Sequence, residues 1–89
     1  MLNVNTYSDC YQVCNTNSSF IEDIHFFFTL DEDENIVDDE WGELVLRLDG
    51  VEYRYQDVPV FIFFALVNAE SLGRYFNSRI KNLYRVITY

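Results

Sequence analysis

The sequence has little glycine, proline, cysteine or histidine, and each scarcity excludes a class of protein. Three glycines and one proline in 89 residues leave no room for a flexible linker, so we expect one small domain. Cys10, Cys14 and His25 are too few for a four-ligand structural zinc site, and they indicate reduced thiols. No nucleophile motif or phosphate-binding loop is present, so we expect no enzymatic activity, no cofactor and no metal.

Long apolar runs are also missing. The longest one, residues 58–67, has ten residues, whereas a helix that spans a bilayer needs about 20. The first ten residues lack the basic and apolar regions of a secretory signal. We therefore expect a cytoplasmic protein with no membrane partner, located in the host cytoplasm if it is encoded by a phage.

Basic residues are scarce in the first two thirds of the chain. Residues 1–57 carry fourteen acids against Arg47 and Arg54, a net charge of −12, whereas residues 58–89 carry one acid against four basic residues, a net charge of +3. The whole chain has a net charge of −9. Such a field repels phosphate backbones and attracts basic surfaces, so it favours a protein partner with a basic surface over nucleic acid without excluding the latter.

A hairpin is the clearest local pattern. Between two runs of alternating apolar residues, Asp49-Gly50 is typical of a two-residue turn with positive φ angles. The resulting register opposes Arg47 and Glu52 as a cross-strand ion pair. It also places six side chains on one core face: Leu44, Leu46, Leu48, Val51, Tyr53 and Tyr55.

Two helices are expected after this hairpin. Pro59 suits the first position of a helix that runs to about Ala69, and Ser71 can cap a second helix that ends near Lys81. Residues 20–30 are expected to form another strand, residues 1–17 an N-terminal arm or edge strand, and residues 84–89 a final strand or an extended tail. We therefore predict an α+β fold in which a small antiparallel sheet of three or four strands is followed by two short helices packed on one face.

Seven of the ten residues at positions 31–40, DEDENIVDDE, are acidic. Such a block repels itself, so we expect a solvated loop over residues 31–43. Its first positions resemble a calcium-binding EF-hand loop, but Ile36 and Gly42 replace the required glycine and glutamate, so no dedicated calcium site is expected. Two interpretations remain: a loop that only contacts solvent, or a loop that docks on a basic protein. Trp41 is expected to be an apolar anchor for such docking or a side chain that covers the core.

Four short motifs resemble the KTSC domain, a family named for the C-terminus of some lysyl-tRNA synthetases. They are SSFIEDI at residues 18–24, the triplet Tyr53-Arg54-Tyr55, the pair Val58-Pro59, and AESLGRYFNSRI at residues 69–80. The resemblance implies a small α+β domain over residues 18–89, often standing alone, with no established activity and a suggested role in RNA binding. The chain departs from the family pattern in its acidic segment.

It departs again after the Val-Pro pair, where residues 60–64 are all apolar although family members tend to carry charge there. A helix that is apolar on every side is normally buried on every side. Because a small two-layer domain leaves one side of such a helix exposed, we expect the helix over residues 59–69 to form a homodimer contact or a surface for another partner.

The leading hypothesis is a non-catalytic interaction module that acts through protein–protein contacts, as a regulator or inhibitor, of phage or mobile-element type, of a basic nucleic-acid-handling protein. The predicted contact residues are Asp31, Glu32, Asp33, Glu34, Asp38, Asp39, Glu40, Trp41, Phe61 and Phe64. The alternative is an RNA- or nucleotide-binding module that uses Tyr53, Tyr55, Arg74, Asn77 and Arg79.

Overall fold

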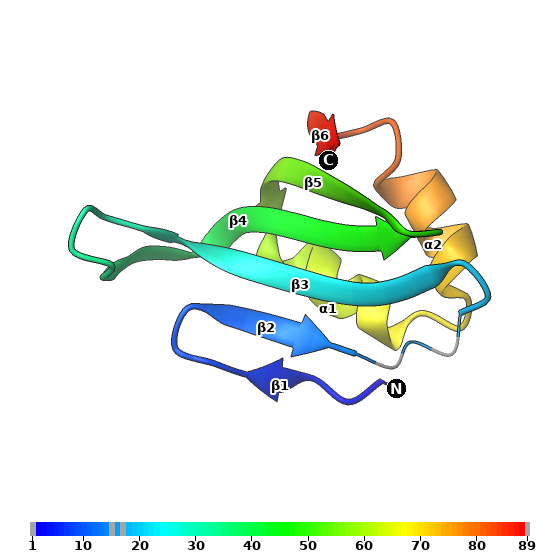
Figure 1. Cartoon of the computed structure of the whole chain (residues 1–89), viewed down its shortest axis with the longest axis horizontal. Coiled ribbons are helices and arrows are strands. Elements are labelled where there is room, and N and C mark those ends of the chain that lie inside the picture. The colour runs from blue at the N-terminus through cyan, green and yellow to red at the C-terminus, as the bar shows by residue number, and fades with distance from the viewer. Residues whose placement is uncertain (1, 15, 17, 89) are drawn as a thin grey trace.

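Each strand of the described chain pairs with the strand next to it in sequence. A computed structural model describes residues 2–14, 16 and 18–88, except for the side chain of residue 39. Over these residues one antiparallel sheet has the strand order β1-β2-β3-β4-β5-β6 (Figure 1). The elements are β1 (Asn5–Thr6), β2 (Cys10–Val13), β3 (Ile21–Leu30), β4 (Ile36–Leu48), β5 (Val51–Pro59), α1 (Val60–Asn68), α2 (Leu72–Arg79) and β6 (Val86–Thr88).

The α+β class with two helices on one face of an antiparallel sheet is confirmed, but the expected size of the sheet is wrong. The described residues form a six-stranded sheet, not one of three or four strands. The additional strands come from the two ends of the chain, where β1 and β2 form a hairpin and β6 pairs with β5. These strands are short, so their sequences carry too few alternating positions to predict pairing.

The central hairpin has the register that the sequence predicts. Asp49 and Gly50 have φ angles of +51° and +82°, and Leu48 pairs with Val51. Arg47 does oppose Glu52. The expected ion pair between them is nevertheless wrong, because the Arg47 guanidinium lies 3.5 Å from the carboxylate of Asp23 on β3 instead.

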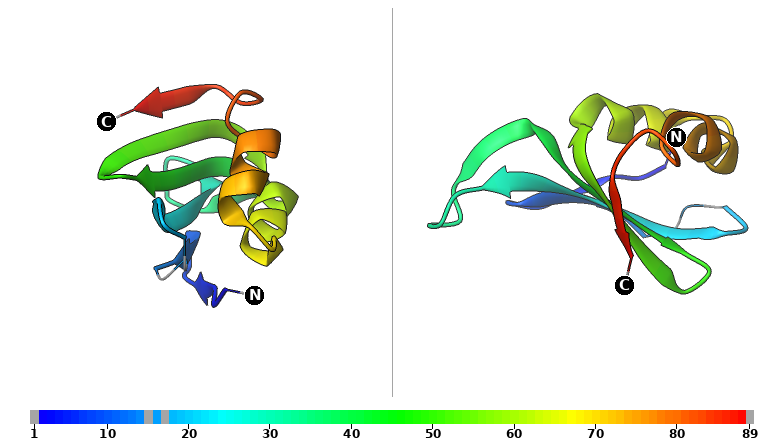
Figure 2. Two further views of the ribbon diagram at one scale, coloured as in Figure 1. Left: turned by 90° about the vertical axis from the view of Figure 1, so that its right-hand side faces the viewer. Right: turned by 90° about the horizontal axis from the view of Figure 1, so that it is seen from above.

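Both helices lie on one face of the sheet, and the opposite face carries no helix (Figure 2). Pro59 ends β5 and is the N-cap of α1, one position before the predicted one. Ser71 caps α2 as predicted, with its side chain accepting a hydrogen bond from the Arg74 N–H at 3.3 Å. The core between the two layers contains Val13, Ile21, Ile24, Phe26, Leu44, Leu46, Tyr55, Val58, Ile62, Phe63, Leu66, Val67, Leu72, Phe76 and Ile80.

The N-terminal hairpin covers part of the apolar surface of α1. The ring of Tyr11 on β2 stacks on Phe63 with a centroid distance of 5.6 Å and meets Phe64 edge-on at 5.2 Å. Phe64 is therefore half-buried within a single chain. Phe61 stays 66% exposed, so one position of the helix keeps a large apolar side chain in solvent.

The acidic segment is not the loop that its composition predicts. β4 begins at Ile36, so only residues 31–35 connect it to β3, and residues 36–43 belong to a strand. Self-repulsion between carboxylates is weak when the side chains point into water, and it does not prevent the backbone from pairing. The β-branched pair Ile36-Val37 supplies the strand propensity, and Leu30 pairs with Ile36.

Candidate protein-binding surface

The end of the β3–β4 hairpin extends beyond the neighbouring strands. We call residues 29–41 the distal hairpin. The pairing of β2 with β3 ends at Cys10 and Phe27, and the pairing of β5 with β4 ends at Pro59 and Trp41. Beyond these positions β3 and β4 pair only with each other, and their tip projects from one end of the molecule (Figures 1 and 2).

The tip is held by a small set of hydrogen bonds around Asp31. One oxygen of its carboxylate accepts hydrogen bonds from the backbone N–H groups of Asp33 and Asn35, both at 2.9 Å. The Asp31 N–H donates to the Asn35 carbonyl at 2.9 Å. The hydrogen bond from the Asn35 backbone is the main reason that the pKa of Asp31 lies below its ordinary value of 3.8. The turn therefore has a defined shape although every side chain in it is exposed.

Acid should loosen this turn. Because folding lowers the pKa of Asp31, the stability that its carboxylate contributes is fully present above the ordinary value of 3.8 and is lost as the pH falls through the lower folded value. We expect an NMR titration to place the pKa of the Asp31 carboxyl below 3.8, and the protection of the Asn35 amide, relative to its intrinsic exchange rate at each pH, to fall in the same pH range. In Asp31→Asn this acid dependence should disappear. An ordinary pKa for Asp31 would contradict the hydrogen bonds described.

A bulge sits at the base of the distal hairpin. The ladder goes from Phe28 opposite Gly42 to Thr29 opposite Asp38, so β4 contains extra residues between these pairs. The Asp38 carboxylate accepts hydrogen bonds from the N–H groups of Glu40 at 2.8 Å and Trp41 at 3.3 Å. The bulge is thus fixed by a side chain of the acidic segment itself, and it leaves the Trp41 side chain 48% exposed.

Large apolar side chains are exposed on and beside the distal hairpin. Ile36 and Val37 are 46% and 59% exposed, and both lie within the acidic run. Trp41 pairs with Pro59, which is the N-cap of α1. The exposed Phe61 comes two residues after Pro59, so it lies near the base of the distal hairpin. This end of the molecule therefore combines carboxylates with exposed apolar groups.

The structure brings most of the predicted contact residues to this end, with two exceptions. Phe64 is half-buried under Tyr11, and the side chain of Asp39 lies outside the described part of the chain. Asp38 is half-buried and the others are exposed: Asp31, Glu32, Asp33, Glu34, Glu40, Trp41 and Phe61. Ile36 and Val37 are not among the predicted contact residues, although two β-branched residues inside an acidic run are a signal for a strand with exposed apolar side chains.

Three carboxylates elsewhere on the sheet, those of Asp23, Glu43 and Glu52, form ion pairs within the molecule. On the face without helices, Arg54 donates hydrogen bonds to Glu43 at 2.6 Å and Glu52 at 2.8 Å, and Gln56 donates to Glu43 at 2.8 Å. Burial acts to lower the pKa of Arg54, but the hydrogen bonds to Glu52 and Glu43 outweigh it and raise that pKa. Among the described side chains of the distal hairpin, by contrast, no carboxylate forms an ion pair.

The residues of the nucleotide-binding alternative do not form one platform. Tyr55 is 2% exposed and its ring meets Phe76 edge-on at 5.9 Å, so neither of its faces is free to stack on a base. Burial is also the main reason that the pKa of Tyr55 is raised. Tyr53 is half-buried on the same strand, whereas the remaining three residues of the alternative are exposed on α2: Arg74, Asn77 and Arg79.

The histidine and the two cysteines lie in or next to strands of the sheet. His25 lies in β3 and stacks on Phe27 with a centroid distance of 5.6 Å. Cys10 is buried in β2, and Cys14 is exposed just after it. Over residues 2–14, 16 and 18–88, no three histidine, cysteine or acidic side chains are grouped as metal ligands would be. None of the described helices has the length and apolar character needed to cross a bilayer.

A cavity of about 430 Å³ lies at the other end of the molecule, between the β2–β3 connection and the start of α2. Its hydroxyl groups already take part in local structure. Ser18 accepts a hydrogen bond from the Ile21 N–H, Thr16 donates to the Ile21 carbonyl, and Ser71 caps α2. Three of the hydroxyl groups that line the cavity therefore stabilise the β2–β3 connection and the start of α2.

The fold and the motifs define a small α+β domain in which an antiparallel hairpin leads into two helices. The sequence profile of the KTSC domain matches residues 38–84, which is more than half of the chain, so the protein belongs to the KTSC domain family. The match begins within β4, so the resemblance seen at residues 18–24 and the tip of the distal hairpin lie before it. Searches of curated proteins and of solved structures found no match.

Proposed function

We propose that this acidic KTSC domain is a non-catalytic interaction module, and that its distal hairpin docks on a basic surface of a partner protein. One observation carries the proposal: Ile36, Val37 and Trp41 expose apolar side chains on a hairpin whose carboxylates form no ion pairs within the described chain. A hairpin that only kept the protein in solution would not need exposed apolar groups.

The two kinds of side chain have different roles in such a contact. Exposed apolar groups, an aromatic anchor such as Trp41 above all, contribute most of the affinity when a partner buries them. The surrounding carboxylates accelerate the encounter and select partners of positive charge. Such a surface fits a partner whose basic patch surrounds an apolar depression.

A basic groove that normally binds nucleic acid has the required charge. The carboxylates of the distal hairpin would occupy it in place of phosphates, so the domain would act as a regulator or inhibitor of a cytoplasmic nucleic-acid-handling protein. Proteins of phages and mobile elements act on such targets, and this origin belongs to the proposal. The charge of the first 57 residues, net −12, supports it.

Removing charge from the tip should abolish partner capture. We choose Glu32→Gln, Glu34→Gln and Glu40→Gln, because these three side chains are exposed while Asp31 and Asp38 hold the turn and the bulge. Affinity capture from the native host at about 150 mM salt should recover a basic protein with the wild type and at least tenfold less with the variant, since both steering and specificity are lost.

The matched control removes the same number of exposed charges at the other end of the molecule, with Glu22→Gln, Asp49→Asn and Glu70→Gln. It should capture the partner as the wild type does. Equal loss in both variants would reduce the effect to net charge and defeat the proposal. Saturable binding of RNA by the wild type at about 150 mM salt, lost in Arg74→Glu, would favour the nucleic-acid alternative instead.

A further inference from the structure

The C-terminal part of the chain has the opposite character to the distal hairpin. Residues 79–88, which we call the cationic tail, contain three basic residues and no acid. Arg79, Lys81 and Arg85 are all exposed. The tail also exposes large apolar side chains, those of Leu83, Val86 and Ile87. In a protein with a net charge of −9, this is a local positive and apolar surface.

The tail ends in an edge strand with an open side. β6 pairs with Tyr53, Arg54 and Tyr55 of β5, and it is the last strand of the sheet that the described residues form. Its outer backbone groups therefore face away from the sheet. Edge strands are usually protected by charge or proline within the strand, but Val86, Ile87 and Thr88 offer neither.

The distal hairpin has an open edge as well. β5 pairs with β4 no further than Trp41, so residues 36–40 of β4 have no strand on that side in the described chain. Before the bulge that follows Asp38, this edge carries the β-branched residues Ile36 and Val37 next to acidic residues, in an extended conformation. Two open edges of opposite charge on one chain can continue a sheet from one molecule into the next.

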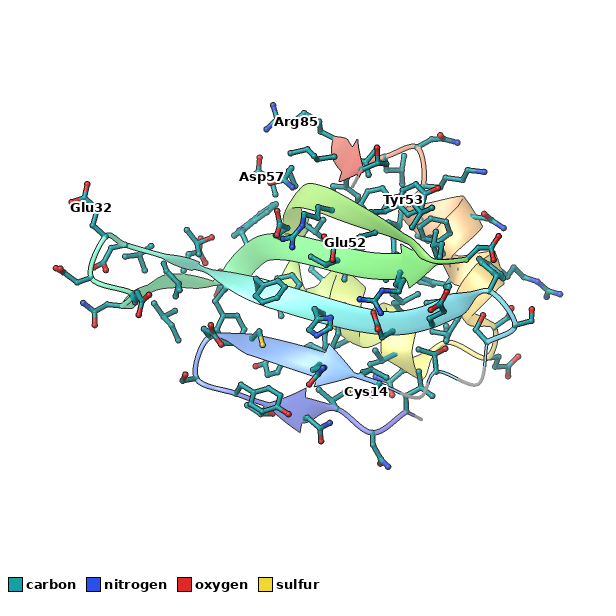
Figure 3. All side chains as sticks on the ribbon, viewed as in Figure 1. Cys14, Glu32, Glu52, Tyr53, Asp57 and Arg85 are labelled. Atoms are coloured by element: carbon teal, nitrogen blue, oxygen red, sulfur yellow. The ribbon has the colours of Figure 1, made fainter. Side chains whose placement is uncertain are left out.

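The two edges cannot meet within one molecule. Figure 3 shows Glu32 at the tip of the distal hairpin and Arg85 beside β6, in separate parts of the molecule, and Figures 1 and 2 show the hairpin pointing away from the tail. Both elements are strands of the same sheet, so no linker could bring them together. A contact between these edges requires two molecules.

We propose that a second copy of this chain occupies the cationic tail: the outer edge of β6 in one molecule pairs with the open edge of the distal hairpin in another. Charge complementarity selects this occupant, because the tail meets seven acids and no basic residue over residues 31–40. The contact joins two different surfaces, so it is head-to-tail and leaves a free hairpin and a free tail at the ends of each assembly.

This inference goes beyond the proposed function, since its occupant is the chain itself. Self-association would also regulate the access of a partner to the acidic surface. In a self-assembled form most hairpins are covered, and a basic partner must compete with the cationic tail of a neighbouring copy. Self-association and partner capture would therefore oppose each other.

Sedimentation velocity on the purified chain tests the inference without any partner. At about 50 mM salt the average mass should rise above 10.6 kDa as the protein concentration increases toward about 500 μM, and it should return to that of the monomer at about 500 mM salt. Two variants with reversed charges each remove the charge complementarity at one of the two edges. The hairpin variant carries Glu32→Lys, Glu34→Lys and Glu40→Lys, and the tail variant carries Lys81→Glu and Arg85→Glu.

Each variant alone should remain a monomer, because the net charge of residues 31–40 falls from −7 to −1 in the hairpin variant, and that of the cationic tail changes from +3 to −1 in the tail variant. An equimolar mixture should form a dimer and nothing larger, since the tail variant supplies an acidic hairpin and the hairpin variant supplies a cationic tail. Far-UV circular dichroism confirms that both variants are folded. A wild type that stays monomeric throughout would overturn the inference. So would a dimer insensitive to both variants but lost in Phe61→Ala, which would show a symmetric contact through α1.

Discussion

Gly42→Ala should destabilise the protein by about 3 kcal/mol or more, the largest effect we expect from adding one methyl group. A Cβ atom at this position would lie 2.1 Å from the carbonyl oxygen of Phe27 and 3.0 Å from the ring of Phe26. Neither atom can withdraw easily, because the first belongs to the backbone of a central strand and the second to a buried ring. Urea denaturation of the wild type and the variant measures the difference in unfolding free energy.

Gly73→Ala is the matched control. Its Cβ would lie 2.5 Å from the ring of Phe20, which is also too close for two carbon atoms, but that ring is partly exposed and can turn away into solvent. Gly73 lies inside α2, where alanine is favoured over glycine by about 1 kcal/mol. The two effects offset each other, so we expect a change within about 1 kcal/mol. Equal destabilisation by both substitutions would show that crowding at the bulge is not the cause.

Phe63→Ala should cost about 3–5 kcal/mol, which is a large part of the stability of so small a domain. The ring of Phe63 is fully buried and contacts three other rings, Tyr11 at 5.6 Å, Phe26 at 5.8 Å and Phe64 at 5.2 Å. Its removal would leave a cavity where α1, β2 and β3 meet. Thermal unfolding should shift downward by roughly 10 °C or more.

The neighbouring substitution Phe61→Ala controls for helix propensity, because both positions lie in the first turns of α1. The Phe61 ring is 66% exposed, so its loss should change the unfolding free energy by no more than about 0.5 kcal/mol. If both substitutions were equally costly, Phe61 would be part of the core and would be unavailable to a partner.

The sequence predicts the centre of this fold and loses accuracy toward its periphery. The register from Leu48 opposite Val51 outward is confirmed because the Asp-Gly turn and the period of two agree with each other. The N-terminal strands were missed as a hairpin because Asn5 and Thr6 carry no apolar pattern, and their position depends on β2 and on contacts of Tyr11 with α1. Such pairing is set by tertiary contacts, which no local pattern encodes.

The acidic segment also shows that local composition does not determine the structure. Its composition predicts a loop, yet Asp31 and Asp38 each use a carboxylate to hold a turn or a bulge, so the acids help to form the strand. The exposure of Asp31 and of the other acids of the turn followed from charge alone. The exposure of Ile36 and Val37 could not be predicted, because a pattern of apolar residues does not show which of them a neighbouring strand will cover.

β4 has two functions along its length. Its proximal half contributes Leu44 and Leu46 to the core, and its distal half forms the projecting edge, with no linker between them. The proposed binding element is therefore ordered before any partner arrives, and the conformational entropy of shaping it belongs to folding and not to association. A partner of this domain would bind a preformed hairpin. Recognition would therefore proceed by rigid docking, and the distal hairpin would not have to fold on its target.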